Sequence, residues 1–262
     1  MRSTWNGALA VGLLVTPVKL YRITGDDEYA FRQVHKKDGG RIQFRRYCSL
    51  DGEEVPYADI GKGKEVGDQM FVLTDEELES LPLPGAKVIA IELFVHAGEI
   101  DLSGLGKAYY IEPDPVGLKA YTLLRQQIKA SGKVGIARFA MRSKDCLVVI
   151  RAHRKMLILQ QLAWPADIRE PAFKFLREEV AVTDKERLLA AQLIDTLSGP
   201  WDPGAYTSKY GEAVEKLIQA KLAGSPPPEP TPAQAAAVAD IGEVLKASIE
   251  AAKAKREEGT AA

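Results

Sequence analysis

The sequence predicts a mixed α+β protein that is mainly β, with an antiparallel β-barrel core followed by a helical C-terminal arm. A sandwich of two sheets fits the same pattern. Three observations lead to this fold class. The chain has 262 residues, enough for one large domain with an appendage. About eight to ten short β-rich segments follow one another with few interruptions, and a run of helices follows them.

The first third of the chain predicts strands joined by tight turns. Residues 3–23 predict two strands around Val15-Thr-Pro17. Residues 31–35 and 41–47 flank Lys37-Asp-Gly-Gly40, which predicts a hairpin because such a turn needs positive φ angles. A short strand at 70–73 leads into Thr74-Asp-Glu-Glu77, a capping box that predicts a brief helix to about Leu81.

The middle of the chain alternates long strands with one helix. Residues 87–95 and 108–112 are rich in β-branched and aromatic side chains and predict strands. Asp114 and Pro115 are typical of a helix start, and Gly132 of a helix end. Residues 133–142, 146–151 and 156–162 then predict three further strands.

The last third predicts helices. Residues 164–182 are irregular, and Thr183-Asp-Lys-Glu186 is a second capping box that opens a helix ended by Gly199-Pro200. A second helix covers 208–223, and the Pro-rich linker at 224–230 is stiff. Residues 231–262 predict an amphipathic helical tail that either docks on its own protein or captures another. The predicted parts are therefore a barrel over 1–182, an arm over 183–223, the linker and the tail.

Charge is strongly segregated along a chain whose net charge is only −1. Residues 125–160 hold nine basic side chains and one acidic one, and residues 31–46 hold six basic side chains against Asp38. Residues 50–80 are acidic, with ten carboxylates against two lysines. Arg138 and Arg142 are four residues apart on one predicted strand and therefore share a face. Two strands with cations on one face can bind a phosphate backbone. Solvated charges on an ordinary hairpin fit the same pattern.

The motifs of common enzymes are absent from the sequence. It lacks a phosphate-binding loop, a Gly-x-Ser-x-Gly motif, a His-Glu-x-x-His motif and a Gly-x-Gly-x-x-Gly motif, and its three histidines lie far apart. We therefore expect a binding protein without a catalytic centre, metal or cofactor. Two cysteines, no signal peptide and no apolar run long enough for a membrane span favour a cytoplasmic, nucleoid-associated protein. The expected DNA-binding residues are Lys36, Lys37, Arg41, Arg45, Arg138, Arg142, Arg151, Arg154 and Lys155.

Seven stretches of the sequence, in order along residues 3–223, resemble the bacterial Ku protein family. They are Trp5–Tyr21, Val34–Ile42, Gly52–Tyr57, Leu81–Pro84, Lys119–Arg125, Ala137–Ala140 and Ala191–Asp195. The resemblance implies a homodimer whose barrels carry long strand excursions that meet in a ring around double-stranded DNA. Such a ring threads onto free DNA ends and recruits the ATP-dependent ligase D for non-homologous end joining. It also implies that residues 125–160 form the encircling bridge, and that dimerisation buries side chains such as Val148 and Ile150.

The chain departs from many relatives in two places. Cys48-Ser-Leu-Asp51 stands where many of them carry Cys-x-x-Cys, so no metal or redox site is expected there. Residues 225–262 carry four basic and six acidic side chains, so the tail is not expected to add DNA contacts. Two rival functions stay open. One is a lyase that attacks abasic sites through a lysine, and the other is a general chromatin-type DNA binder.

Overall fold

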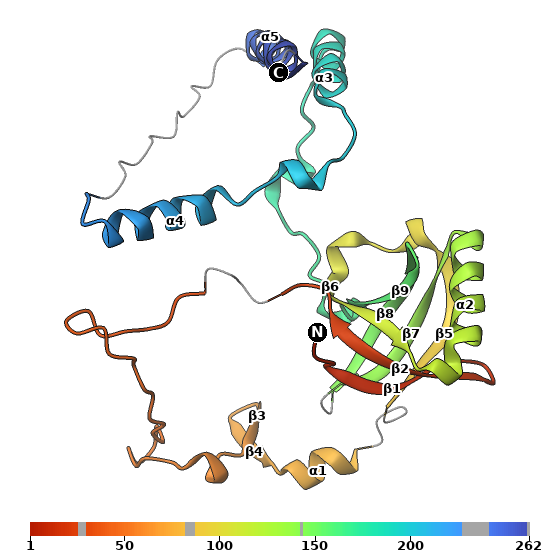
Figure 1. The fold of residues 1–262 in the computed structure, drawn as a ribbon, viewed down its shortest axis with the longest axis vertical. Helices are drawn as coiled ribbons and strands as arrows, with labels where there is room; N and C mark the ends of the chain where they lie inside the picture. The colour runs from red at the N-terminus through yellow and green to blue at the C-terminus, as the bar shows by residue number, and fades with distance from the viewer. Residues whose placement is uncertain (26–29, 82–86, 142–143, 227–240, 261–262) are drawn as a thin grey trace. The chain divides into compact units, whose positions relative to one another are not determined.

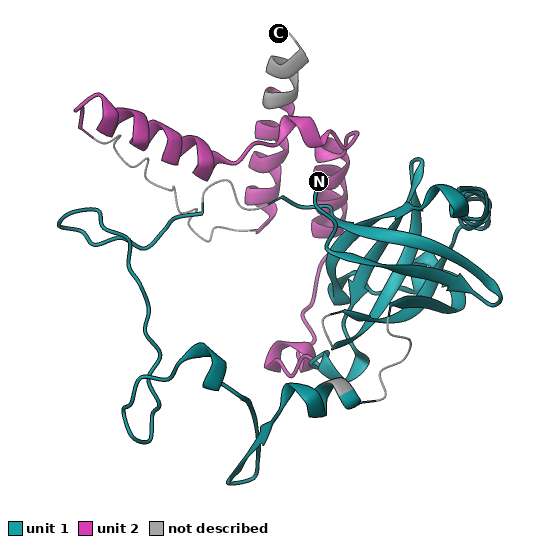
Figure 2. Ribbon diagram, turned by 60° about the horizontal axis from the view of Figure 1, so that its bottom comes forward, with its two compact units in different colours: residues 1–170 teal, residues 171–262 magenta. Residues whose placement is uncertain are grey.

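The structure is a computed structural model that describes residues 1–25, 30–81, 87–141, 144–226 and 241–260. The chain divides into two compact units, residues 1–170 and 171–262 (Figure 2). The boundary at residue 170 comes before residue 182, where the sequence predicts the end of the barrel. Within the described ranges, no helix is both long and apolar enough to cross a membrane.

Seven strands of the first unit close into a barrel (Figure 1), which confirms the predicted antiparallel barrel core. Around the barrel their order is β1-β2-β6-β9-β8-β7-β5, and β5 pairs with β1 in the one parallel contact of the seven. The strands are β1 Trp5–Val11, β2 Leu14–Arg22, β5 Val88–His96, β6 Leu105–Pro113, β7 Lys133–Met141, β8 Lys144–His153 and β9 Met156–Leu162.

Every second residue of these strands faces the barrel interior, as the two-residue period of a strand dictates. Phe139, for example, is fully buried, and its ring meets that of Trp5 edge to face with 5.4 Å between the centroids. The side chains buried in this core include Leu9, Val18, Leu20, Ile89, Ile111, Ala137, Phe139, Val148, Ile150, Leu157 and Leu159.

Helix α2 (Leu118–Ser131) packs against the barrel with Tyr121 and Ile128 in the core. It begins near the predicted start, since the Asp114 carboxylate accepts from the Val116 N–H at 3.2 Å, and it ends at Gly132 with φ +64°. The Tyr121 hydroxyl donates to the Ile111 carbonyl and accepts from the Leu157 N–H, both at 2.7 Å. Burial raises the pKa of this phenol. Tyr121 therefore ties together the end of β6 and the start of β9.

The first hairpin turns earlier than predicted. The β1–β2 turn lies at Gly12 and Leu13, where Gly12 has φ +56°, and not around Val15-Thr-Pro17. Pro17 instead sits inside β2, opposite Ala8, one residue before β2 begins to pair with β6 at Val18. A proline lacks an N–H donor and is tolerated where no neighbouring strand requires one.

The structure contradicts the prediction that residues 125–160 leave the barrel as a bridge. The segment contains the end of α2 and the three neighbouring barrel strands β7, β8 and β9. Val148 and Ile150, expected to be buried only by a second copy, are fully buried within one chain. The physical reason is that these strands have neighbours on both sides in the closed barrel, so their apolar faces already have a core.

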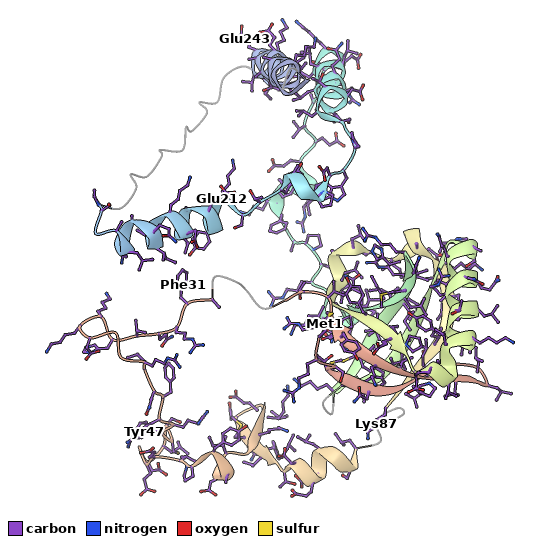
Figure 3. All side chains as sticks on the ribbon, viewed as in Figure 1. Met1, Phe31, Tyr47, Lys87, Glu212 and Glu243 are labelled. Carbon is purple, nitrogen blue, oxygen red and sulfur yellow. The ribbon has the colours of Figure 1, made fainter. Side chains whose placement is uncertain are left out.

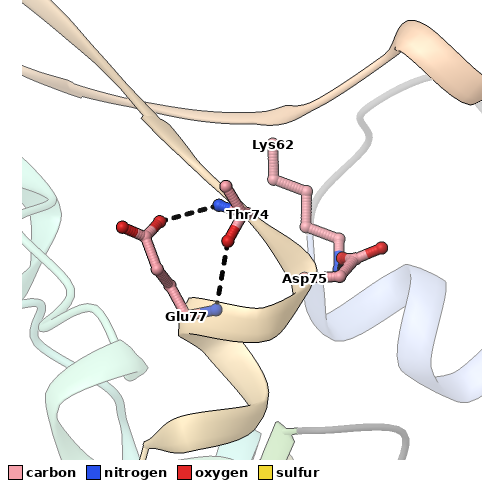
Figure 4. Close-up of polar contacts among 4 residues, drawn as sticks. All are labelled: Lys62, Thr74, Asp75 and Glu77. Atoms are coloured by element: carbon pink, nitrogen blue, oxygen red, sulfur yellow. Dashed lines mark hydrogen bonds and ion pairs between the residues drawn. The ribbon is translucent and has the colours of Figure 1, made fainter.

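The long excursion instead lies between β2 and β5. Its described part, residues 30–81, holds the short pair β3 (Lys62–Val66) and β4 (Gln69–Leu73) and helix α1 (Asp75–Ser80). The predicted capping box is present: the Glu77 N–H donates to the Thr74 hydroxyl at 3.1 Å, and the Thr74 N–H donates to Glu77 at 2.9 Å (Figure 4). The strands predicted at 31–35 and 41–47 reduce to two isolated bridges, Val34 with Arg41 and Tyr47 with Glu54.

The second unit is helical, as predicted, with α3 (Asp184–Leu197), α4 (Lys209–Leu222) and α5 (Ile241–Thr260). Thr183 and Glu186 form the predicted capping box of α3. Helix α5 packs against α3, and Ile249 of its predicted apolar stripe is buried. The tail helix thus docks on its own protein. Val238, which belongs to the predicted stripe, lies outside the described residues.

We predict that Tyr121→Phe destabilises the barrel, because it removes a hydroxyl that bonds two buried backbone groups. The expected loss in the free energy of unfolding is about 1–3 kcal/mol. Urea denaturation measures it. Tyr110→Phe is the matched control, since the Tyr110 hydroxyl bonds to no described residue, and an equal loss in both variants would contradict the role given to Tyr121.

Candidate nucleic-acid interface

Two tight turns organise the basic part of the excursion. In the first, the Gly39 N–H donates to the His35 carbonyl at 2.9 Å, and the His35 N–H donates to the Gly40 carbonyl at 2.8 Å. Gly39 has φ +72°, which explains why Asp-Gly-Gly stands here. The Gly40 N–H and the His35 ring both contact the Asp38 carboxylate at 2.9 Å and lower its pKa. The turn thus presents Lys36 and Lys37 at its tip, beside a carboxylate that stays ionised.

The second turn lies between Cys48 and Glu53. The Gly52 N–H donates to the Cys48 carbonyl at 3.0 Å, and Gly52 has φ +76°. Asp51 accepts from the Glu53 N–H at 2.9 Å, and this bond, with a contact from Cys48, lowers the pKa of Asp51. Among the described residues, no group of three or more His, Cys, Asp or Glu side chains is placed to hold a metal ion.

The basic side chains of residues 31–46 fall into two classes. Arg45 pairs with Glu54 at 3.0 Å, and the Arg46 guanidinium lies 5.2 Å from the centre of the Tyr57 ring. The others are exposed and make no ion pair with any residue that the structure describes. This unpaired set is Arg32, Lys36, Lys37 and Arg41. An exposed pair such as Arg45–Glu54 stabilises little and exchanges readily for a phosphate.

The basic residues predicted on the barrel are placed differently. Arg138 points outward from β7, where it pairs with Glu92 at 3.3 Å and lies 5.7 Å from the centre of the Trp164 ring. Arg142 lies outside the described residues. The two arginines therefore give no observed cationic face, and the one that is described already has an acidic partner.

The other basic residues predicted on the barrel gather at the β8–β9 turn. Arg151 is half-buried near the end of β8, and Arg154 and Lys155 are exposed between the two strands. Arg154 has φ +52°, and its carbonyl accepts from the Arg125 guanidinium at 3.2 Å.

Apart from Arg138 on β7 and Arg142, which lies outside the described residues, the predicted site residues form two groups within the first unit. Lys36, Lys37, Arg41 and Arg45 lie in one stretch of the excursion, and Arg151, Arg154 and Lys155 lie at one turn of the barrel. Sequence reasoning did not single out Arg32 or Arg125. Arg32 belongs to the basic run 31–46, so its position in that run was the available signal. The contact between Arg125 and the Arg154 carbonyl joins a helix to a distant turn and has no sequence signal.

Large apolar side chains of the excursion are exposed. Phe31, Phe44 and Tyr47 are 70%, 73% and 61% exposed, and Figure 3 shows Phe31 and Tyr47 on an extended stretch of chain. So many exposed apolar side chains within one segment indicate an interaction site. Further exposed apolar side chains in the excursion are Val34, Ile42, Leu50, Tyr57, Ile60, Val66, Met70, Phe71 and Val72.

Comparison with known proteins gives one consistent match. A family model described as the Ku70/Ku80 beta-barrel domain matches residues 10–190. A protein of Frankia casuarinae named "Non-homologous end joining protein Ku" is 42% identical over 258 residues, which cover 98% of this chain and 65% of that protein.

Two further proteins carry the same name. The one from Streptomyces griseus is 40% identical, with 98% of this chain and 66% of that protein covered. The one from Mycolicibacterium smegmatis is 37% identical, with 86% of this chain and 72% of that protein covered. The chain therefore spans just under two thirds of the length of the first two relatives.

Proposed function

We propose that this chain, which belongs to the Ku family, acts in non-homologous end joining as a homodimeric ring that binds double-stranded DNA ends. The observation that carries the proposal is the composition of the excursion. Its residues 31–46 hold four unpaired cations, the excursion carries a series of exposed apolar side chains, and it lacks a core of its own in the described residues.

The excursion, rather than residues 125–160, is the segment that we assign to the DNA-encircling bridge. Its apolar side chains need cover, and a second copy of the same segment supplies it in a symmetric contact. Its unpaired cations then face the enclosed duplex. Because the acidic residues of 50–80 follow the basic residues of 31–46, the charge of the excursion changes from basic to acidic along its length. This separation favours one face toward DNA and another toward solvent.

Phosphate contacts explain how such a ring accepts any DNA end. Bonds to phosphate supply affinity but read no sequence. Selectivity for ends then comes from closure, since an intact circle has no terminus to thread. With four unpaired cations in each of two copies, about eight phosphates are neutralised, and the logarithm of affinity falls against the logarithm of salt concentration with a slope of about −7.

The triple variant Lys36→Ala/Lys37→Ala/Arg41→Ala tests this assignment. We expect weaker binding to all duplex sequences alike and a salt slope that is less negative by about 5, because six cations leave the dimer. Fluorescence anisotropy over a salt series measures it.

The matched control removes the same number of charges from exposed positions on α4 as Lys209→Ala/Lys216→Ala/Lys221→Ala. An equal change of slope in the two variants would show that net charge, and not the excursion, determines binding.

Comparison of linear with circular DNA tests whether the protein closes into a ring around the duplex. A linear duplex should compete for the protein far better than a covalently closed circle of the same sequence and length at equal salt. Gel-shift competition measures both. Equal competition would exclude threading and would favour a general chromatin-type DNA binder.

Recruitment of ligase D completes the proposed function. Joining of the same linear fragments measures recruitment. Purified ligase D should join them faster when this protein is present, and added circular DNA should leave that joining rate unchanged. Unchanged joining would separate end binding from ligase recruitment. The exposed helices of residues 171–223 and the following linker are the candidate contact region.

Dimerisation is predicted to depend on the excursion. Phe44→Asp should weaken the dimer by more than about tenfold, the order expected for an aromatic anchor in an interface. Sedimentation velocity over a concentration series measures the dissociation constant. Leu13→Asp is the control, because Leu13 is fully exposed on the β1–β2 turn, outside the excursion. A wild-type chain that sediments as a monomer at micromolar concentration would contradict the ring.

A further inference from the structure

One end of the barrel holds a pocket of about 380 Å³ that the end-binding model does not use. The residues that line it come from the N-terminal segment and from five strands. They are Thr4, Arg22, Lys107, Tyr109, Met141, Lys144, Cys146 and Gln161. The pocket lies where β2 and β7 end and where β6 and β8 begin, which is the end opposite Tyr121. Mouths of β-barrels are common sites for small ligands, and this volume falls in the usual range for such sites.

The cations of this pocket occupy positions that face the barrel axis. Arg22 follows Val18 and Leu20 in the inward alternation of β2, and Lys144 precedes Cys146 and Val148 in that of β8. Lys107 lies in the register shift of β6 between Leu105 and Ala108, two residues before the buried Tyr109, and its side chain lines the pocket. Deeper in the barrel these positions are apolar. The three side chains therefore converge on one mouth instead of spreading over the outer surface.

No acidic side chain is among the described residues that line the pocket, and none of the three cations has an ion-pair partner in the described chain. Like charges gathered in a concave site repel one another, and the site focuses a positive potential. Such an arrangement is stabilised by a bound anion.

Neutral donors complete the wall. Tyr109 is only 5% exposed, and its hydroxyl bonds to no described residue although the side chain lines the pocket. The Gln161 amide lies 3.9 Å from the Cys146 sulfur. Burial raises the pKa of the Cys146 thiol, so this residue adds no negative charge. The Thr4 hydroxyl already donates a hydrogen bond to the Leu20 carbonyl at 3.1 Å.

A phosphate monoester suits this pocket better than a backbone phosphodiester does. A monoester carries a charge of about −1.5 to −2 at neutral pH and offers three acceptor oxygens, whereas a phosphodiester carries only one charge. A phosphate at a strand terminus can also enter the pocket at the end of the barrel. A phosphate within a continuous duplex backbone stays on the outer surface of the duplex.

We propose that the barrel mouth binds a phosphate monoester, either the terminal phosphate of a DNA strand or the phosphate of a free nucleotide. Arg22, Lys107 and Lys144 bind the phosphate oxygens, and Tyr109 and Gln161 donate to it. The DNA source rests on the proposed function, but binding of the phosphate group does not.

The alkylation rate of the Cys146 thiol, which lines the pocket, measures phosphate binding. In the full-length Cys48→Ser variant it is the only thiol, and its alkylation by iodoacetamide is followed by mass spectrometry. Orthophosphate that replaces chloride at constant ionic strength should slow alkylation in a saturable way. In Arg22→Gln/Lys107→Gln the concentration needed should rise by about tenfold for each cation removed.

Lys19→Gln is the matched control, because Lys19 is exposed on the outer face of β2, on the same strand as Arg22. It should leave protection unchanged. Lys144→Gln, at the exposed start of β8, replaces the double variant if that variant does not fold. Absence of saturable protection, or equal protection in the pocket and control variants, would overturn the proposal.

Two pairs of probes distinguish the sources of the phosphate. A nucleoside 5′-monophosphate is compared with its nucleoside, and a 5′-phosphorylated linear duplex with its 5′-hydroxyl form. Protection by the phosphorylated duplex at a lower concentration than its partner supports the strand terminus, and protection by the monophosphate alone supports a free nucleotide. The competition of linear and circular DNA tests end binding separately, so the two proposals can fail independently.

Discussion

The pairing of β5 with β1 closes the barrel, and the other features of the first unit depend on this closure. An open sheet of these seven strands would leave two edges and no enclosed core. With the sheet closed, Tyr121 joins β6 to β9 at one end, and the pocket with Arg22 occupies the other. The chain leaves β2 at that second end and returns at β5, so a long segment can be inserted without disturbing the barrel.

Arg138 of the barrel and the two lysines of the inserted segment have different surroundings. On the barrel, Arg138 is paired with Glu92 and also lies near the Trp164 ring. In the excursion, Lys36 and Lys37 project from a glycine turn whose geometry is maintained by Asp38. A cation on a rigid turn loses little conformational freedom when it binds a phosphate. This difference, and not the number of basic residues, makes the excursion the better candidate for DNA.

Much of the local structure could be predicted from the sequence. The capping boxes at Thr74 and Thr183, the glycine turn at Gly39 and the helix end at Gly132 all depend on contacts within a few residues. The positions of most barrel strands follow in the same way from β-branched runs. The turn near Pro17 was misplaced because a proline usually marks a turn, whereas here it occupies a strand position that one neighbouring strand does not reach.

The sequence by itself determined the fold class, the family resemblance, the local caps and turns and the segregation of charge, because these depend on residue type and short-range spacing. Only the tertiary structure decided which basic segment belongs to the barrel wall and which leaves it. Residues 125–160 and 31–46 are both basic and both rich in β-forming residues, and strand pairing between distant segments separates them. The same pairing brought Arg22, Lys107 and Lys144 to one barrel mouth, since convergence of three strands has no signal in the order of the residues.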